Sequence, residues 1–304
     1  MQYPSFDQPV DYARMTELLD AMREAYPFLA ITSLGCSLRD RRIPLITLGE
    51  GKKAVLYVGT HHAMEWVTTS VLLKFIFEFC EVYAKDGLIG SLSLQTLFST
   101  RTIYIVPMLN PDGVEYQQHG VAPDDILYDR LMSMNGGCPD FSRWQANARG
   151  VDLNHNYNAG FAEYKRLEKD AGILGGAPTR YSGESPESEP ETGALCNFMR
   201  FRQDIGMVVT LHTQGEEIYT SAGDDAAGER VRALGRSFSF VTGYRLADPE
   251  GMAAYGGLTD WCREIKLPAF TFECGLGENP LPAADSFEIY AKIRRALFLA
   301  PTWI

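Results

Sequence analysis

The sequence predicts an α/β fold, with a largely parallel sheet and helices on both of its faces. Segments typical of strands alternate with segments typical of helices, which is the pattern of strands joined by crossover helices. The segments 54–59 and 101–108 are short apolar runs, as expected of strands that are buried on both faces. The length of 304 residues, with 45% hydrophobic and 22% charged residues, fits a globular protein, and we expect one domain over residues 1–304.

The other elements follow from periodicity and from turn residues. Asn-Pro-Asp-Gly at 110–113 is expected to form a turn, and 114–190 to be a long functional loop because it is rich in Gly, Pro, Asp and Asn. The acidic run 184–191 is expected to be solvated. Strands are expected at 42–48, 54–59, 101–108, 206–212 and 269–273, and helices at 11–26, 65–84, 188–202, 230–241, 258–265 and 285–298.

The negative net charge of the chain argues against nucleic acids and anionic membranes as partners. The chain has 28 Lys and Arg against 39 Asp and Glu, which gives a formal net charge of −11. Affinity for nucleic acid comes largely from cations that displace counterions, and anionic membranes attract basic segments. We therefore expect neither a nucleic acid nor a membrane as a partner, and no run of apolar residues is long enough to span a bilayer.

Cysteine usage and the amino terminus favour the cytoplasm. The six cysteines form no Cys-x-x-Cys pair and are too few for a disulfide framework in a chain of this length, so reduced thiols are expected. The first seven residues contain neither the basic nor the apolar segment of a signal peptide. We expect a cytoplasmic protein, unless a leader has been removed.

Polar residues stand at the ends of three predicted strands. His62 and Glu65 follow one strand at a spacing of three, which places both side chains on one side of a helical turn. His212 and Glu273 end two other strands. Each residue alone could be a buried histidine or half of an ion pair. The carboxyl ends of parallel strands meet at one sheet edge, however, and two histidines with one carboxylate form a catalytic zinc set that leaves a position for water.

Several motifs of the chain occur in a recognisable order. They are His-Ala-Met-Glu-Trp at 62–66, Asn-Pro-Asp-Gly at 110–113, Gly-Val-Asp-Leu-Asn at 150–154, the strand that ends at His212, and Phe-Thr-Phe-Glu at 270–273. With these motifs the sequence resembles the zinc carboxypeptidases of the carboxypeptidase A type. Segments 212–219 and 273–282 are similar to the bacterial γ-D-glutamyl–diaminopimelate peptidases, which cut cell-wall stem peptides. The resemblance implies a three-layer α/β/α sandwich around a mixed, mostly parallel sheet.

The resemblance also implies roles for single residues. His62, Glu65 and His212 would be the ligands of Zn²⁺, and Asp152 would orient His62. Glu273 would act as general base and then as general acid. These roles are physically sound, because zinc brings bound water to a pKa of about 7 and a nearby carboxylate can accept and return its proton.

Departures from the family pattern bear on the substrate. The carboxypeptidases have an Arg where this sequence has His155, next to Asn154, and that Arg clasps the terminal carboxylate of the substrate. Arg offers a permanent charge in a bidentate fork, whereas histidine does not at neutral pH. The Arg that helps to hold the oxyanion aligns with Gln145, and Arg149 or Arg143 are candidates to compensate for it.

Two more positions complete the expected substrate-binding set. The mobile tyrosine of the family aligns with Met252, and Tyr255 is a nearby substitute. The base of the specificity pocket aligns with Thr259, which suits a polar side chain better than an aromatic one. The expected substrate-binding residues are therefore Gln145, Asn154, His155, Tyr255 and Thr259.

The sequence thus indicates a zinc metallopeptidase that hydrolyses an amide bond in a muropeptide stem, and the γ-D-glutamyl–diaminopimelate bond is the first choice. Three alternatives stay open. One is a metallocarboxypeptidase that releases a polar C-terminal residue, and another is an amidohydrolase acting on N-acylated amino acids. The third is a non-hydrolytic peptide-binding protein of the same fold, against which the retention of Glu273 and all three ligands argues.

Overall fold

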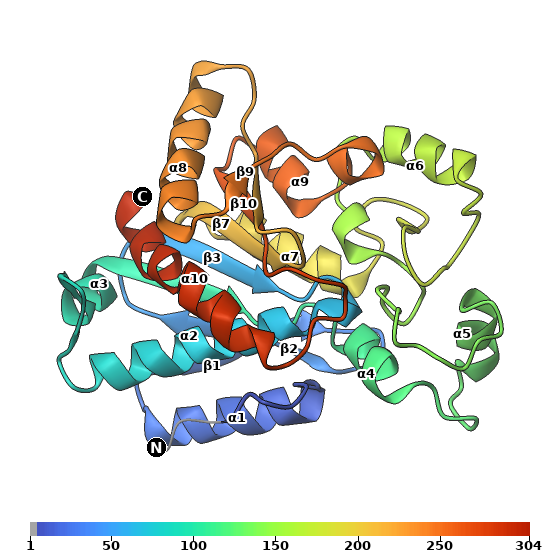
Figure 1. Cartoon of the computed structure of the whole chain (residues 1–304), viewed down its shortest axis with the longest axis horizontal. Coiled ribbons are helices and arrows are strands. Elements are labelled where there is room, and N and C mark those ends of the chain that lie inside the picture. The colour runs from blue at the N-terminus through green and yellow to red at the C-terminus, as the bar shows by residue number, and fades with distance from the viewer. Residues whose placement is uncertain (1–4) are drawn as a thin grey trace.

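The computed structural model describes residues 5–304 and is built on one eight-stranded sheet (Figure 1). The strand order is β1-β2-β6-β3-β7-β10-β8-β9. The four central strands, β6, β3, β7 and β10, run parallel. β2 pairs antiparallel with both β1 and β6, β8 pairs antiparallel with β10, and β9 is parallel to β8. The strands are β1 (Ala30–Cys36), β2 (Arg42–Leu48), β3 (Lys53–Gly59), β6 (Arg101–Val106), β7 (Ile205–His212), β8 (Glu217–Thr220), β9 (Arg245–Leu246) and β10 (Ala269–Glu273).

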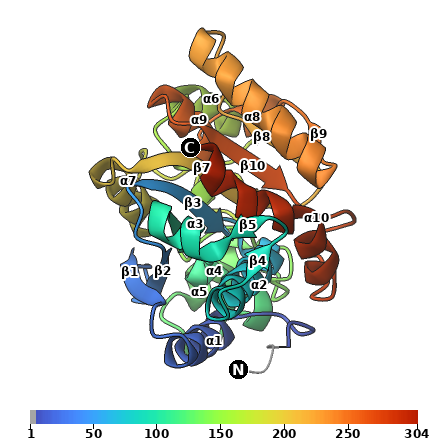
Figure 2. The ribbon, with the colours of Figure 1, turned by 90° about the vertical axis from the view of Figure 1, so that its left-hand side faces the viewer.

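Two helical layers cover the sheet, as expected of an α/β/α sandwich. Successive side chains of a strand point to opposite faces, so Val55 and Tyr57 of β3 join one apolar cluster and Leu56 and Val58 join the other. α7 and α10 lie on opposite sides of the sheet (Figure 2). One layer contains α1 (Tyr12–Ala25), α2 (Val67–Tyr83), α8 (Ala226–Thr242) and α10 (Asp285–Leu299), and the other contains α7 (Pro190–Phe201) and α9 (Leu258–Glu264).

The turn predicted at 110–113 is wrong, because this segment begins a helix. α4 (Pro111–His119) starts there, with Pro111 in its first turn and the Asn110 side chain accepting a hydrogen bond from the Gly113 amide. Proline is well tolerated at the first helical position, and asparagine is a favoured N-cap. The expected loop 114–190 also contains α5 (Tyr128–Met134) and α6 (Phe161–Asp170), at the right of Figure 1.

Several short strands were not predicted from the sequence. β1, β8 and β9 lie at or next to the sheet edges, and β4 (Leu88–Ile89) and β5 (Leu92–Ser93) form a separate hairpin before α3 (Leu94–Thr100). Edge strands bury fewer side chains, so they lack the apolar run of a central strand. The helix expected at 65–84 is α2, which begins at Val67. A short 3₁₀ turn, η1 (Ala63–Glu65), precedes it.

The acidic run 184–191 is not fully solvated, contrary to expectation. Glu189, the N-cap of α7, and Glu191 in its first turn are buried, and Asn147 donates hydrogen bonds to both carboxylates. The six cysteines are free, as predicted from their spacing. Within residues 5–304, no helix has both the length and the apolar character that crossing a membrane requires. Residues 1–4, part of the segment inspected for a signal peptide, lie outside the described residues.

Candidate active site

The turn after β3 is fixed by hydroxyl contacts. Thr60 has a left-handed φ of 53°, and its hydroxyl contacts the hydroxyls of Thr68 and Thr69 at 2.8 Å each. The Asn110 side chain donates to the carbonyl of His61 at 3.0 Å. These bonds tie the strand end to α2 and α4, so the backbone that carries the next residue, His62, is held from two sides.

Three side chains from two strand ends converge at this edge of the sheet. The Nδ1 of His62 lies 2.9 Å from Oε1 of Glu65, and the Nδ1 of His212 lies 3.0 Å from the other carboxylate oxygen. The two Nδ1 atoms are 3.3 Å apart. β3 and β7 are parallel neighbours, so their carboxyl ends bring His62 and His212 together. The potential ligand atoms of the three residues lie within 4.8 Å of one another.

The donor set fits a zinc ion. Nε2 of His62 lies 3.0 Å from Oδ1 of Asp152, so this nitrogen carries the proton and Nδ1 turns its lone pair toward Glu65 and His212. Imidazole nitrogens and a carboxylate that face one point in a buried site repel unless a cation or a proton lies between them. Two histidines and one carboxylate are the protein ligands of many catalytic zinc sites.

Electrostatics within the cluster are strong. Burial opposes ionisation of Glu65, but His62 and His212 outweigh it and hold the pKa of that carboxyl well below its usual range. Burial likewise disfavours a charged His62, but Glu65 and Asp152 outweigh it and raise the pKa of this imidazole well above its usual range. The site therefore strongly favours positive charge at its centre.

Glu273 lies next to the cluster on the adjoining strand. β10 is the parallel neighbour of β7, and Glu273 is in register with His212. Its carboxyl is within the same cavity as His62. Burial first, and then the negative charge of Glu65, raise the pKa of Glu273 above its usual range. A carboxyl so placed is suited to exchange a proton with a group bound at the cluster.

Two cavities flank His62. One, of about 110 Å³, contains Glu273 and is lined at its polar wall by Thr259 and Thr271, whose hydroxyls are 2.6 Å apart. The other, of about 350 Å³, does not include Glu273 among its lining residues. The second cavity is lined by Gln145, Asp152, Thr179, Arg180, Glu250 and Met252, and His62, His155 and Ala253 line both.

Comparison with known proteins gives the family. The zinc carboxypeptidase family (Peptidase_M14) matches residues 15–287. The chain is 33% identical over 298 residues to the gamma-D-glutamyl-L-diamino acid endopeptidase 1 of Lysinibacillus sphaericus, covering 98% of this chain and 73% of that protein. This chain belongs to the zinc carboxypeptidase family. It is therefore a metallopeptidase of that family, whose name implies Zn²⁺.

Solved structures agree on the fold of this zinc carboxypeptidase. Thrombin-activatable fibrinolysis inhibitor superposes with a TM-score of 0.74 at 21% identity, covering 96% of this chain and 73% of the other. The murein-tripeptide amidase MpaA from Escherichia coli O157 gives a TM-score of 0.57 at 22% identity, covering 91% and 94%. The mixed, mostly parallel sheet between two helical layers is thus the fold of the family.

His155, the residue found where the resemblance led us to expect an arginine in a carboxypeptidase, lines both cavities. Its Nδ1 donates to the carbonyl of Tyr255 at 2.8 Å, and its ring stacks on Tyr164 with centroids 4.2 Å apart. Burial lowers the pKa of His155 despite the opposing influence of Asp152. This position therefore presents a neutral ring at neutral pH, not a cationic clamp.

The other expected substrate contacts divide into two groups. Asn154 and Thr259 line the smaller cavity, and Gln145 lines the larger one. The Gln145 side-chain oxygen accepts a hydrogen bond from Thr179, while its amide nitrogen makes no hydrogen bond to any residue from 5 to 304. Tyr255 lines neither cavity. Its ring packs against Gly160, and the neighbouring turn η3 (Gly251–Ala254) brings Met252 to the larger cavity instead.

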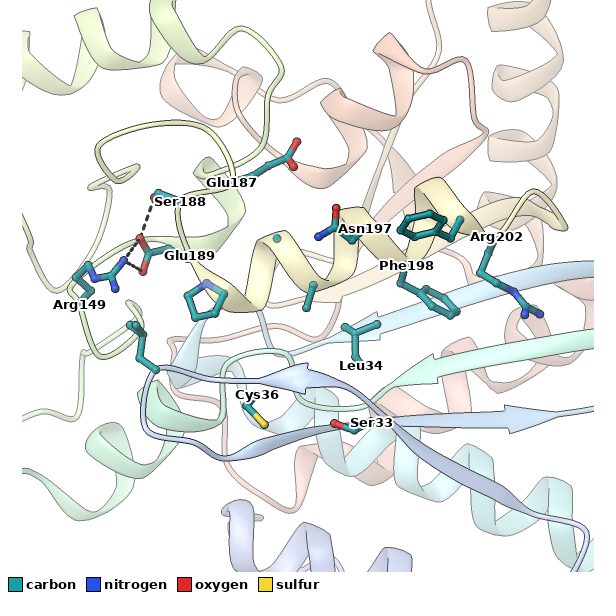
Figure 3. Close-up of a pocket in the computed structure, with 15 residues that line it drawn as sticks. Ser33, Leu34, Cys36, Arg149, Glu187, Ser188, Glu189, Asn197, Phe198 and Arg202 are labelled. Atoms are coloured by element: carbon teal, nitrogen blue, oxygen red, sulfur yellow. Dashed lines mark hydrogen bonds and ion pairs between the residues drawn. The ribbon is translucent and has the colours of Figure 1, made fainter.

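The two arginines considered as substitutes for the missing cation point elsewhere. Arg149 forms an ion pair with Glu189 at 3.1 Å, at the rim of a separate cavity of about 850 Å³ between β1 and α7 (Figure 3). Arg143 contacts Glu278 and the carbonyl of Asn279. Neither arginine lines a cavity that contains His62.

Sequence reasoning missed four polar residues that line the cavities of this zinc carboxypeptidase. Thr271 precedes Glu273 by two positions on β10 and faces the same cavity, which the period of two in a strand could have indicated. Arg263 follows Asp260 by one helical turn on α9, and both line that cavity. Arg180 lies in a segment without helix or strand, where no periodicity predicts the direction of a side chain.

Proposed function

We propose that this chain is a zinc-dependent peptidase that hydrolyses the amide bond between a γ-D-glutamyl residue and a diamino acid in bacterial cell-wall stem peptides. The observation that carries the proposal is that the buried His155 ring is neutral at neutral pH. A neutral ring at this position cannot act as a cationic clamp for a C-terminal carboxylate. Without that clamp, release of ordinary C-terminal residues loses its main source of binding energy.

A relative supports the choice of bond. The protein that is 33% identical over 98% of this chain is named a gamma-D-glutamyl-L-diamino acid endopeptidase. The cavity next to Glu273 also offers polar groups, because Thr259, Thr271, Asp260 and Arg263 are among its lining residues. A diamino acid carries an additional polar group on its side chain, and a pocket with hydroxyl, carboxylate and guanidinium groups is suited to it.

The proposed reaction is amide hydrolysis with defined proton transfers. A zinc ion held by His62, Glu65 and His212 would supply Lewis acidity and water of lowered pKa. Glu273 takes the proton as the water oxygen attacks the carbonyl carbon, and it returns this proton to the amine nitrogen as the C–N bond breaks. The free amide nitrogen of Gln145 is positioned to donate a hydrogen bond to the carbonyl oxygen. The products are a carboxylate and an amine.

The decisive experiment is digestion of defined substrates by the zinc-loaded protein. L-Ala-γ-D-Glu linked to a diamino acid should give two products by mass spectrometry. Glu273→Gln should lower kcat by about 10²- to 10⁴-fold with unchanged zinc content, while Glu163→Gln, on the exposed surface of α6, should have no effect.

The same assay separates the alternatives. Cleavage of a blocked dipeptide in preference to the stem peptide would indicate a carboxypeptidase, and release of an acyl group from N-acylated aspartate would indicate an amidohydrolase. Tight binding of the stem peptide without products would indicate a binding protein. Each of these outcomes contradicts the proposal. The cytoplasmic location expected from the sequence stays a prediction, which cell fractionation with an antibody to the chain would test.

A further inference from the structure

A single arginine in the larger cavity has no partner. Arg180 lines the cavity that contains His62 and Gln145, and its guanidinium makes no hydrogen bond or ion pair with the described residues, 5–304. The other arginine that lines a cavity beside His62 is engaged, because Arg263 pairs with Asp260. An unpaired guanidinium beside a buried catalytic cluster is a ready receptor for a carboxylate.

The backbone of Arg180 is fixed by the site itself. Its N–H donates to Oδ2 of Asp152 at 3.1 Å, and its carbonyl accepts from the Tyr164 hydroxyl at 3.0 Å. Its φ of 65° lies in the left-handed region, which costs a non-glycine residue free energy unless surrounding contacts hold it. Since Asp152 also binds His62, the position of Arg180 is linked directly to that of the metal-binding cluster.

The two cavities indicate which half of the substrate lies on which side of His62. Glu273 lines only the smaller cavity, and it must reach the amine nitrogen to which it returns the proton. The leaving diamino acid therefore lies on the Glu273 side. The acyl half of the substrate then extends over the larger cavity, toward Gln145 and Arg180.

We propose that Arg180 binds the free α-carboxylate of the γ-linked D-glutamyl residue, and this inference rests on the proposed function. A γ-linkage leaves the α-carboxylate four bonds from the scissile carbonyl carbon, on the acyl side, whereas an α-linked residue has an anion at that distance only when it is itself glutamyl. Glu250 lines the same cavity but forms no ion pair with Arg180 within residues 5–304, so it leaves the guanidinium open to an anionic ligand. Arg180 thereby selects a γ-D-glutamyl residue with a free α-carboxylate over the same residue with this carboxylate amidated.

Two substrates and matched variants test this selection. The substrates are L-Ala-γ-D-Glu linked to a diamino acid, and the same peptide with the α-carboxylate converted to an amide. Wild type should prefer the carboxylate form by about ten- to hundredfold in kcat/KM. Arg180→Gln should lose this preference by slowing only the carboxylate form, and Arg180→Lys should recover part of it.

Controls separate recognition from folding. Glutamine keeps the backbone N–H and carbonyl bonds of position 180, so zinc content and melting temperature should not change. Arg166→Gln, whose arginine pairs with Glu163 and Asp170 on α6, should retain the preference of wild type.

The two proposals fail in different ways. Equal cleavage of both peptides by wild type, or an equal loss of both in Arg180→Gln, overturns the assignment of Arg180 and leaves the proposed function in place. Cleavage of neither peptide by zinc-loaded wild type overturns both proposals together.

Discussion

At the scale of single residues, Asp152 connects the parts of the site. One carboxylate oxygen contacts Nε2 of His62, and the other accepts the backbone N–H of Arg180. Burial opposes ionisation, but His62 outweighs it and lowers the pKa of Asp152 below its usual range. The carboxylate therefore stays ionised while it orients a proposed zinc ligand and a proposed substrate-binding residue.

Asp152→Asn tests this connection. An amide has only one acceptor oxygen, so either His62 or the Arg180 N–H loses its bond and faces a donor. Zinc affinity should fall by about 10- to 100-fold, as is typical when a group that orients a ligand is lost. Competition with a chelator measures the change. Asp129→Asn, at an exposed position, should leave the affinity as in wild type, and an equal loss in both variants would contradict the assigned role.

Glu191 provides a second prediction at this scale. Its Oε1 is buried without a hydrogen-bond partner among residues 5–304, and Oε2 lies 3.3 Å from Nδ2 of Asn147. Burial raises the pKa of Glu191 to about 8. The folded protein thus binds this proton more tightly than the unfolded chain, so the contribution of Glu191 to stability is full below pH 4.5 and is lost as the pH rises toward 8.

Glu191→Gln should therefore become more stable than wild type as the pH rises. The difference in the free energy of unfolding should be small at pH 4 and should grow to at most about 5 kcal/mol above pH 8, because the pKa rises from 4.5 to about 8 and each pKa unit corresponds to about 1.4 kcal/mol. Urea unfolding at several pH values measures this difference. Glu184→Gln, at an exposed position of the same run, should show no such trend.

At the scale of secondary-structure elements, the central strands of the sheet could be predicted from the sequence, whereas the short strands at or next to its edges could not. The strands expected at 54–59, 206–212 and 269–273 match β3, β7 and β10 to within one residue, because burial on both faces requires an unbroken apolar run. The ligand-bearing strand ends followed from this. The position of Arg180 depends on a segment that is held by tertiary hydrogen bonds, such as the one to Asp152, and local sequence does not encode these.

The end of β3 is packed too closely for any side chain at Gly59. A Cβ there would lie 2.8 Å from the carbonyl oxygen of Pro107 and 2.9 Å from Leu72. Gly59→Ala should lower the free energy of unfolding by about 1–3 kcal/mol and weaken zinc binding, because the strand must move just before His62. Denaturant unfolding and zinc titration measure the two effects.

A glycine with more room serves as the control for this variant. At Gly193, on α7, an added Cβ would meet only the carbonyl of Glu187 at 3.5 Å, an ordinary contact. Gly193→Ala should leave zinc binding unchanged and stability equal or slightly higher, because alanine favours the helix. A loss in this variant as large as in Gly59→Ala would contradict the packing argument.

At the scale of the whole molecule, the candidate metal site lies at one edge of the hydrophobic core. Two apolar clusters fill the layers on either side of the sheet, while the proposed ligands join only the ends of β3 and β7. Chelation should therefore leave the protein folded but less stable. Free zinc at 100 times its Kd should stabilise the native state by about 2.7 kcal/mol.

Calorimetry with and without zinc checks this prediction. The melting temperature of wild type should fall by several degrees after chelation and recover when zinc is restored. In His212→Ala, which lacks one of the proposed ligands, zinc should shift the melting temperature much less. Unfolding of chelated wild type at room temperature would show instead that the ion holds the fold together.

Under the proposed function and the proposed direction of the substrate, the unequal cavities beside His62 have a consequence for the order in which a cell-wall fragment is degraded. The leaving side offers about 110 Å³ and the acyl side about 350 Å³, roughly three times as much space. Fragments extended by D-alanine beyond the diamino acid should therefore be poor substrates until an exopeptidase has shortened them. Fragments that still carry their sugar at the amino end should be processed without delay, which places this enzyme after carboxyl-terminal trimming.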